Sequence, residues 1–400
     1  MKIKILFVIE SLALAGSEKS LVALLSSVDA DLYEIDLQLI TLGGALEKFV
    51  PEFVNILPPL PYPTFASQSW LNNIKRIFST SSFTYIKSKI RYSLSLRTKD
   101  RSHPEIAQLY WECAKNVFSP QEKEYDVAIA YAQGVPTFYL IDKIKAKKKV
   151  TWVNANMQFS TKNKEYQKNY YTQFDAIVAV TEDTKKHLIT IFPTLSFKCI
   201  VIHDIVDYKS ILKMVDLFSP AMKKDKFNIL TVARLEKGMK GLDIAINASK
   251  FLKESGADFH WYFLGHGSFK SEMELYINLN KLQKYVTLLG TSANPYPFFK
   301  AANLYVQTSR SESYGISIAE ARLLNIPIVT TRFDNVGVQM VDGKNGLVTD
   351  INAQAVAYAI EKLMKDKELY NSIVEYLKEE QKENTETVDD FNKMVDSLAQ

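Results

Sequence analysis

Two glutamates frame the stretch of this sequence that is best suited to chemistry. Glu312 and Glu320 lie eight positions apart, and Gly315 and Ser317 stand between them. The pattern predicts the end of a strand, a tight turn and the start of a helix. Such a turn presents backbone N–H groups and the positive end of a helix dipole to an anion. A carboxylate on each side can accept hydrogen bonds from the hydroxyls of a sugar and a ribose, and Gly315 lets a ligand approach the backbone closely.

The second glutamate also has an ordinary explanation. Ser317-Ile318-Ala319-Glu320 fits a capping box, in which Glu320 only closes the start of the helix. The sequence leaves both roles open for Glu320. Glu312 precedes the helix, so the capping box does not account for it.

Two cations follow a predicted strand at 227–233. Arg234 comes directly after this strand, and Lys240 lies six residues later, before a predicted helix. An arginine fork binds oxygens bidentately and a lysine adds a point charge, so the pair suits a diphosphate. The alternative is that both are solvated loop charges, as we expect for the neighbouring Lys237.

Three glycines lie in predicted strand-to-helix loops. Gly16 separates the first strand from the first helix, where it can let the backbone approach a phosphate or a donor sugar. Gly265 and Gly267 flank His266 in a tight turn that we expect to lie under a nucleotide. The full glycine fingerprint of dinucleotide-binding loops is absent.

The sequence predicts no metal and no other cofactor. Asp29-Ala30-Asp31 resembles an acidic metal-binding pair, but it follows a helix and lies away from the carboxyl ends of the strands. Cys113 and Cys199 form no zinc spacing and no disulfide framework, which fits a reducing cytosol.

Strands and helices alternate along the chain in two series, which is typical of parallel sheets covered on both faces. We predict strands at 3–9, 33–41, 53–57, 125–130, 148–153, 176–180 and 198–202, and then at 227–233, 259–264, 286–289, 304–307 and, as the last, 328–331. Prolines 58, 59, 61 and 63 are expected to end regular structure, and Thr181 to cap a helix. Later helices are expected at 241–254, 268–280, 317–324, 353–365, 369–383 and 386–399.

This rhythm predicts an α/β fold with two Rossmann-like, doubly wound domains facing across a cleft. We place an N-terminal, acceptor-side domain at 1–205 and a C-terminal, nucleotide-sugar-binding domain at 206–384, with 203–226 as the linker. Residues 385–400 form a last helix that we expect to pack back on the N-terminal domain. Ligands in such folds bind beyond the carboxyl ends of the strands, which is where the residues above lie.

Residues 70–101 form a basic stretch within the N-terminal domain. It carries eight cations against Asp100 alone, interleaved with aromatic and aliphatic side chains. It suits either an anionic membrane surface or a solvated helical hairpin that covers the sheet. No nucleic-acid-binding motif accompanies the charge. The N-terminus predicts a strand and no signal peptide, and no apolar run approaches the roughly 20 residues of a membrane span. We therefore expect a cytoplasmic protein, peripheral on the inner face of the cell membrane.

These motifs together resemble the family-four (group 1) retaining glycosyltransferases of the GT-B fold. Glu312 and Glu320 match the family's two glutamates with seven residues between them, and Arg234 and Lys240 match its two cationic positions. Ala15-Gly16-Ser17-Glu18 looks like the family's Gly-Gly-Ala-Glu loop. Most of the chain takes part in the resemblance, which is strongest over 227–350.

The resemblance implies transfer of a hexose-type sugar from a nucleotide donor, usually UDP-linked, with retained anomeric configuration and without a metal. It also implies an acceptor that is a glycan or a lipid-linked glycan in bacterial-type surface polysaccharide synthesis. By the same resemblance, Arg234 and Lys240 are expected to hold the diphosphate, Glu312 to contact the donor sugar and Glu320 the ribose. The donor is also expected to lie against Gly16, Gly265, Gly267, Tyr314, Gly315, Ile316 and Ser317.

Two positions depart from the family pattern. Asn154 stands where the family often has a histidine that approaches the donor sugar, and Gln339 where many relatives have a glutamate. Asparagine can hydrogen-bond a hydroxyl but cannot carry charge. A non-catalytic, membrane-associated sugar-nucleotide binding protein therefore stays open, with Asn154 as the mark of lost catalysis. A sugar-nucleotide 2-epimerase of the same architecture is the other alternative.

Overall fold

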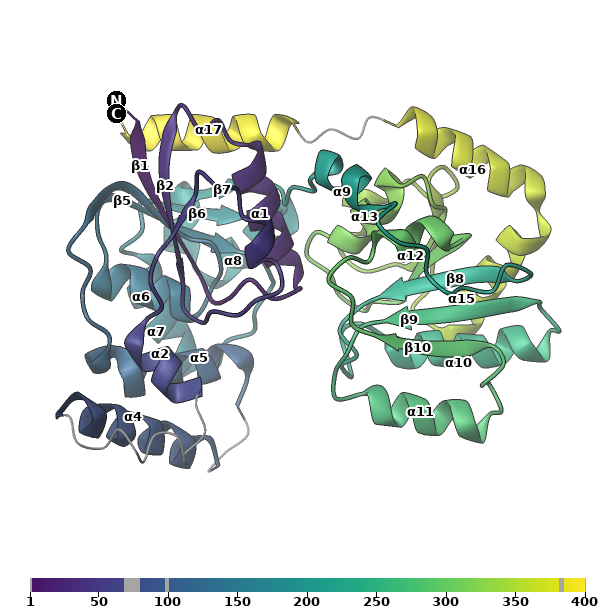
Figure 1. The fold of residues 1–400 in the computed structure, drawn as a ribbon, viewed down its shortest axis with the longest axis horizontal. Coiled ribbons are helices and arrows are strands. Elements are labelled where there is room, and N and C mark those ends of the chain that lie inside the picture. Colours follow the sequence, from purple (N-terminus) through teal and green to yellow (C-terminus); the bar gives the residue numbers. More distant parts are fainter. Residues whose placement is uncertain (1, 68–79, 98–100, 381–384, 400) are drawn as a thin grey trace. The chain divides into compact units, whose positions relative to one another are not determined.

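The computed structural model describes residues 2–67, 80–97, 101–380 and 385–399, which form two compact units (Figure 1). The N-terminal unit holds the described residues up to Ile205 together with those from Thr385 onward. The C-terminal unit holds the described residues from Val206 to Glu380. Each unit is an α/β structure with one all-parallel sheet, which confirms the predicted fold class.

The N-terminal unit is built on seven parallel strands in the order β3-β2-β1-β4-β5-β6-β7. In β1, Ile5 and Phe7 belong to one buried apolar cluster and Leu6 and Val8 to another, so successive side chains fill the cores on opposite faces of the sheet. The strands are β1 (Ile3–Ile9), β2 (Tyr33–Leu39), β3 (Asn55–Ile56), β4 (Glu124–Ala130), β5 (Lys145–Val153), β6 (Ala176–Ala179) and β7 (Cys199–Val201). The helices are α1 (Gly16–Ser27), α2 (Pro61–Ser67), α4 (Thr80–Leu96), α5 (His103–Ala114), α6 (Val135–Lys143), α7 (Thr161–Tyr171), α8 (Glu182–Ile191) and α17 (Thr385–Ala399).

The last helix, α17, packs on the sheet of the N-terminal unit. Phe391 and Val395 are fully buried in the apolar cluster that also contains Phe7 of β1. The Tyr33 hydroxyl of β2 donates a hydrogen bond to Asn392 at 2.8 Å. The chain thus returns to the unit in which it began.

The C-terminal unit is built on six parallel strands in the order β10-β9-β8-β11-β12-β13. The strands are β8 (Phe227–Val232), β9 (Phe259–Leu264), β10 (Val286–Gly290), β11 (Leu304–Gln307), β12 (Ile328–Thr331) and β13 (Gly346–Thr349). The helices are α9 (Tyr208–Met214), α10 (Leu242–Glu254), α11 (Lys270–Leu279), α12 (Tyr296–Ala301), α13 (Ile316–Leu323), α14 (Val336–Gln339), α15 (Ala353–Lys365) and α16 (Lys367–Glu379).

Three sequence expectations about elements are wrong. The stretch 203–226 is not only a linker, because it contains α9, whose Ile211 is buried in the core of the C-terminal unit. The prolines after β3 do not all end regular structure, because Pro58 and Pro59 follow the end of the strand but Pro61 begins α2. The strand at 328–331 is not the last, since β13 pairs with it in parallel. Thr181, by contrast, caps α8 as expected and accepts a hydrogen bond from the Thr184 N–H.

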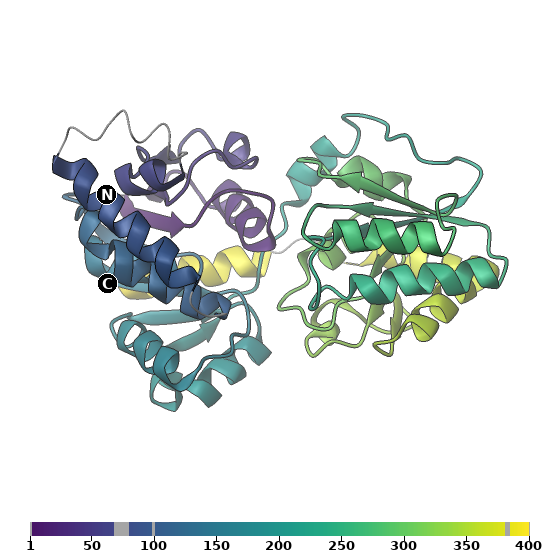
Figure 2. The same cartoon turned by 90° about the horizontal axis from the view of Figure 1, so that it is seen from below.

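The described part of the basic stretch is helix α4 with its flanking residues, whereas 68–79 and 98–100 lie outside the described residues. Helix α4 packs mainly on α5 and α2, so it forms an outer layer and does not cover the sheet directly as the hairpin alternative had it. Figures 1 and 2 show it on the outside of this unit. None of the described helices combines the length and the apolar character of a membrane span.

Candidate functional site

The predicted turn lies between β11 and α13. Gly315 is the N-cap of α13 with φ 79° and ψ 51°, a left-handed conformation that glycine adopts without strain. The N–H groups of the first helical turn follow it directly, at Ile316 and Ser317. This end of the helix is therefore the anion-binding geometry that the sequence predicted.

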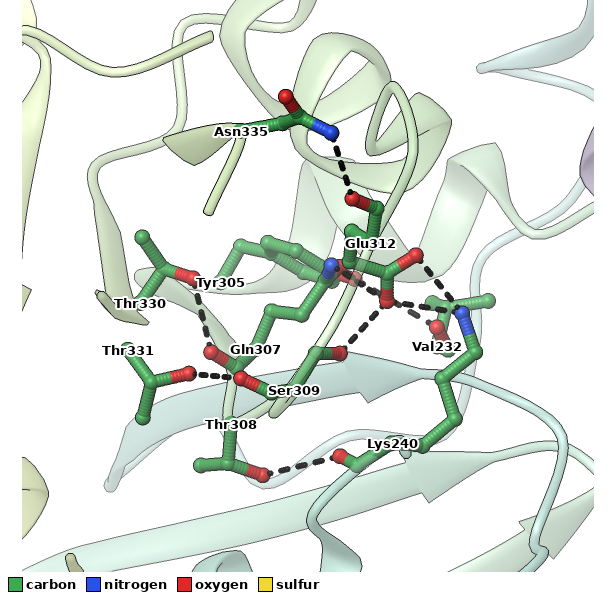
Figure 3. Close-up of polar contacts among 10 residues, drawn as sticks. All are labelled: Val232, Lys240, Tyr305, Gln307, Thr308, Ser309, Glu312, Thr330, Thr331 and Asn335. Atoms are coloured by element: carbon green, nitrogen blue, oxygen red, sulfur yellow. Dashed lines mark hydrogen bonds and ion pairs between the residues drawn. The ribbon is translucent and has the colours of Figure 1, made fainter. Parts of the chain in front are cut away.

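Glu312 is the centre of a polar network in this loop (Figure 3). Its side chain is 11% exposed, and Lys240 donates to both carboxylate oxygens, at 2.8 and 3.0 Å. Gln307 and Ser309 donate to Oε1 at 3.0 and 2.6 Å. The structure thus brings together Lys240 and Glu312, which the sequence assigned to a diphosphate and a sugar.

The capping-box alternative for Glu320 is wrong. Because Gly315 is the N-cap of α13, Ser317 is the second helical residue and cannot cap the helix. Glu320 is buried and accepts a hydrogen bond from the Tyr296 hydroxyl of α12 at 3.0 Å. Burial, and then the charge of Glu320, raise the pKa of Tyr296 well above its usual range, so the hydroxyl stays a donor.

Arg234 and Lys240 differ in how they are held. The Arg234 side chain is 59% exposed, and its ion pair with Glu236 is 3.4 Å long. The Lys240 loop is fixed by Gly241, at φ 59°, where an added Cβ would lie 1.8 Å from the Thr308 carbonyl oxygen. Gly241 therefore lets the Lys240 loop pack on the Glu312 loop, a role the sequence reasoning missed.

Gly265 and Gly267 allow the loop after β9 to pack closely on the loop after β8. An added Cβ would lie 1.8 Å from the Ala233 carbonyl oxygen at Gly265 and 2.2 Å from that of Leu235 at Gly267. These contacts with protein backbone require glycine. The predicted contact of this turn with a nucleotide stays a prediction.

Gly16 and Asn154 belong to the N-terminal unit. Gly16 is the first residue of α1, and next to it Glu18 accepts hydrogen bonds from the Ala15 N–H at 2.7 Å and from Ser11 at 2.9 Å. Asn154 follows β5 and donates from Nδ2 to the Tyr131 carbonyl at 2.9 Å. Its Oδ1 is buried and has no hydrogen-bond partner in the described part of the chain.

Gln339 and the acidic pair Asp29/Asp31 each have a local role in the structure. Gln339 is buried and accepts a hydrogen bond from Arg322 of α13. The Asp29 carboxylate accepts from the Asp31 N–H at 2.8 Å, which shapes the turn before β2. Within the described ranges, no three His, Cys, Asp or Glu side chains come together as a metal site requires. That the protein needs no metal stays a prediction.

The sequence reasoning missed Gln307 and Ser309, which hold Glu312, and Tyr296, which holds Glu320. Gln307 ends β11, for which the sequence predicts a strand at 304–307 and nothing more. The available signal was its register, because Tyr305 and Gln307 are polar at alternate positions of that strand and so lie on one face of the sheet.

Comparison with known proteins agrees with this architecture. Residues 215–380 match the model of the family "Glycosyl transferases group 1". An uncharacterised glycosyltransferase of Methanocaldococcus jannaschii is 28% identical over 195 residues, 46% of this chain and 47% of that protein. The alpha-monoglucosyldiacylglycerol synthase of Acholeplasma laidlawii is 28% identical over 142 residues, 35% of each chain. This chain is thus matched to about half the length of the first relative and about a third of the second.

A solved structure resembles the chain over its whole length. The Anabaena protein HepE, in complex with UDP and glucose, superposes with a TM-score of 0.71 at 18% identity, covering 99% of this chain and 100% of that one. At this identity the likeness establishes the fold, which is the GT-B fold of glycosyltransferases.

Proposed function

We propose that this chain, a member of the group 1 glycosyltransferases with the GT-B fold, transfers a hexose-type sugar from a UDP-linked donor to a glycan or lipid-linked glycan. The observation that carries this is the Lys240–Glu312 pair beside the N-terminal turn of α13. It combines a cation, a carboxylate and the N–H groups of the first turn of a helix, which suit a diphosphate joined to a sugar. The UDP and glucose bound by HepE support this choice of donor.

The donor is held in parts by the C-terminal unit. Arg234 and Lys240 bind the diphosphate, and the turn Tyr314–Ser317 adds N–H donors to it. Glu312 accepts from the sugar hydroxyls and Glu320 from the ribose, with Gly265 and Gly267 beneath the nucleotide. These two cations offset the charge that develops on the leaving diphosphate, which is the largest catalytic contribution we assign to the protein.

The reaction retains the anomeric configuration and needs no metal. The bond between C1 of the sugar and the β-phosphate oxygen breaks, and the acceptor oxygen bonds to C1 on the same face. The acceptor proton passes to the β-phosphate, so UDP leaves with it and no side chain has to act as a base. The Asn154 Oδ1 atom of the N-terminal unit is buried without a protein partner among the described residues, so it has the capacity to accept a hydrogen bond.

The acceptor is reached at an anionic membrane surface on the cytoplasmic side through helix α4. Phe83, Ile90 and Leu94 lie on one stripe of this helix and are 71%, 41% and 58% exposed. Lys87 and Arg91 of α4 and Arg97, which follows the helix, are also exposed, and residues 80–97 contain no Asp or Glu. Apolar side chains between cations suit the boundary between acyl chains and anionic headgroups.

The test begins with a panel of UDP- and GDP-sugars. A cognate donor raises the melting temperature of the folded protein by binding to it. Incubation of that donor with glycan and lipid-linked acceptors should then release UDP and give a product whose NMR spectrum shows the donor's anomeric configuration. An epimerised donor would favour the 2-epimerase, and binding without turnover would favour the non-catalytic protein. An inverted product would contradict the retaining mechanism.

A further inference from the structure

The two oxygens of the Glu312 carboxylate have different surroundings. Oε1 accepts three hydrogen bonds, from Lys240 at 2.8 Å, Gln307 at 3.0 Å and Ser309 at 2.6 Å. Oε2 accepts from Lys240 at 3.0 Å, and the described residues supply it with no second donor. A carboxylate oxygen with three donors has little capacity left, so Oε2 is the atom that can take a further hydroxyl.

Gln307 is fixed in one amide orientation. Its side chain is buried at the end of β11, with Nε2 donating to Glu312 and Oε1 accepting from the Tyr305 hydroxyl at 2.8 Å (Figure 3). If the amide were reversed, its oxygen would face the Glu312 carboxylate, and its NH₂ group would face the Tyr305 hydroxyl, which is itself a donor. Tyr305 therefore determines which end of the amide meets Glu312.

Tyr305 is itself held as a donor. The residue is fully buried, and burial raises the pKa of its hydroxyl, to which the charges of Glu312 and Glu320 also contribute. The hydroxyl oxygen lies 2.8 Å from Gln307 Oε1 and 3.5 Å from the Val232 carbonyl, so the shorter contact takes the proton. The chain of hydrogen bonds then runs from Tyr305 through Gln307 to Glu312.

We propose that Gln307, oriented by Tyr305, is a positioning residue that anchors Glu312 Oε1 and leaves Oε2 directed at the donor sugar. The inference rests on the proposed function, because it assigns Glu312 to the sugar. Packing alone does not explain a glutamine here, since an apolar side chain of similar volume would avoid burying an amide. The backbone of Gln307 has its own partner, as its carbonyl accepts from Thr330 at 2.9 Å.

The experiment compares Gln307→Leu, Tyr305→Phe and the double variant with the parent chain. Thermal shift is measured with UDP alone and with UDP-glucose, UDP-galactose and their N-acetylated forms. Because Gln307 acts at the sugar and not at the diphosphate, UDP should stabilise all variants as it does the parent. The additional affinity for the cognate UDP-sugar should fall about tenfold in Gln307→Leu, and kcat for transfer about tenfold or more, as expected for a displaced group.

The double variant separates positioning from general loss of structure. If Tyr305 acts through Gln307, Tyr305→Phe lowers kcat severalfold in the parent but changes nothing further in Gln307→Leu. Gln38→Leu is the matched control, since Gln38 is a buried strand glutamine of the N-terminal unit, hydrogen-bonded to Leu39 and Gln121. It should match the parent in the difference between UDP and UDP-sugar binding.

Each outcome decides the inference. One outcome is that a UDP-sugar stabilises the parent more than UDP does and stabilises Gln307→Leu by the same additional amount. That result overturns the role of Gln307 and leaves the proposed function standing. Additive effects of Tyr305→Phe and Gln307→Leu overturn the orienting role of Tyr305. If no UDP-sugar stabilises the parent more than UDP does, the proposed function is contradicted, and the inference falls with it.

Discussion

The loop around Glu312 and the outer face of α4 show two ways of presenting functional side chains. In the C-terminal unit, Glu312 is 11% exposed, and three side chains donate to it. On α4 of the N-terminal unit, Phe83 and Leu94 are 71% and 58% exposed, between exposed cations. The first arrangement holds one geometry and suits a ligand of fixed structure. The second leaves large apolar and cationic side chains exposed and suits a fluid surface. Single substitutions should therefore have large effects in the first region and small, cumulative ones in the second.

Glu312→Gln should have the largest effect. The amide cannot accept at both positions and loses the ion pair with Lys240, so we expect transfer to fall by about 100-fold or more. UDP should still raise the melting temperature, because the diphosphate cations remain. The measurement is UDP release in the presence of acceptor. Glu272→Gln, which removes the exposed partner of Lys237, is the control. Full transfer by Glu312→Gln would refute its assignment to the donor sugar.

Lys240→Met should weaken UDP binding. Losing a charge-assisted contact to the diphosphate corresponds to about 2 kcal/mol, or about thirtyfold in affinity. Lys237 offers a matched control three residues earlier, because its side chain is 72% exposed and paired with Glu272 at the surface. Isothermal titration with UDP should find Lys237→Met unchanged within about twofold. Equal effects of both substitutions would show that general loop charge, and not a site, binds the nucleotide.

Arg322→Met should destabilise the C-terminal unit without touching the proposed ligand. Arg322 of α13 pairs with Glu380 at 2.8 Å, with side chains 22% and 13% exposed, and it also donates to Gln339. Removing one partner leaves a mostly buried carboxylate, which we expect to lower the free energy of unfolding by about 3 kcal/mol. Lys378→Met breaks the exposed ion pair with Glu375 and should change the free energy of unfolding by less than about 0.5 kcal/mol. Urea unfolding measures both, and similar values for the two would contradict the burial argument.

Asp204→Asn tests a buried carboxyl of the N-terminal unit through pH. Burial raises the pKa of Asp204 from 3.8 to about 6, and its Oδ1 has no partner among the described residues. The folded state therefore binds this proton more tightly than the unfolded chain, and stability is lost as pH rises from 3.8 to about 6. Asparagine does not titrate, so the stability of the variant relative to the parent should increase across this window by about 3 kcal/mol and then level off. Thermal unfolding of both proteins at several pH values measures this stability difference. A difference that does not change with pH would contradict the raised pKa of Asp204.

Much of the fold could be predicted because buried parallel strands are short apolar runs. Strands β9, β11 and β12 lie at the predicted residues. Strand β13 was missed because it begins at Gly346, which reads as a turn. An added Cβ there would lie 2.2 Å from the Ile328 carbonyl oxygen, so contact with the neighbouring strand, and not local preference, places glycine there.

The candidate site was only partly accessible to sequence reasoning. Lys240 and Glu312 were both named, but they are 72 residues apart and meet only because β8 and β11 are neighbours in the sheet. The capping box failed because a glycine with positive φ can take the N-cap position that serine was expected to hold. Gln307 was missed because its role depends on two side-chain partners, which a strand pattern does not specify.

The smallest effects are expected on α4. Phe83→Ser and Leu94→Ser each remove apolar area that would enter the headgroup boundary, and each should weaken binding to vesicles containing phosphatidylglycerol by about tenfold or less. Phe197→Ser is the matched control, because Phe197 is 80% exposed elsewhere in the N-terminal unit. Lys87→Gln should reduce binding at low salt and have little effect at high salt, since only the charge contribution is screened. Flotation with these vesicles and with neutral phosphatidylcholine vesicles measures all four variants. If Phe197→Ser lowers flotation as much as Phe83→Ser, or if neutral vesicles bind equally well, α4 is not the membrane-facing surface, and the contrast with the Glu312 loop has another cause.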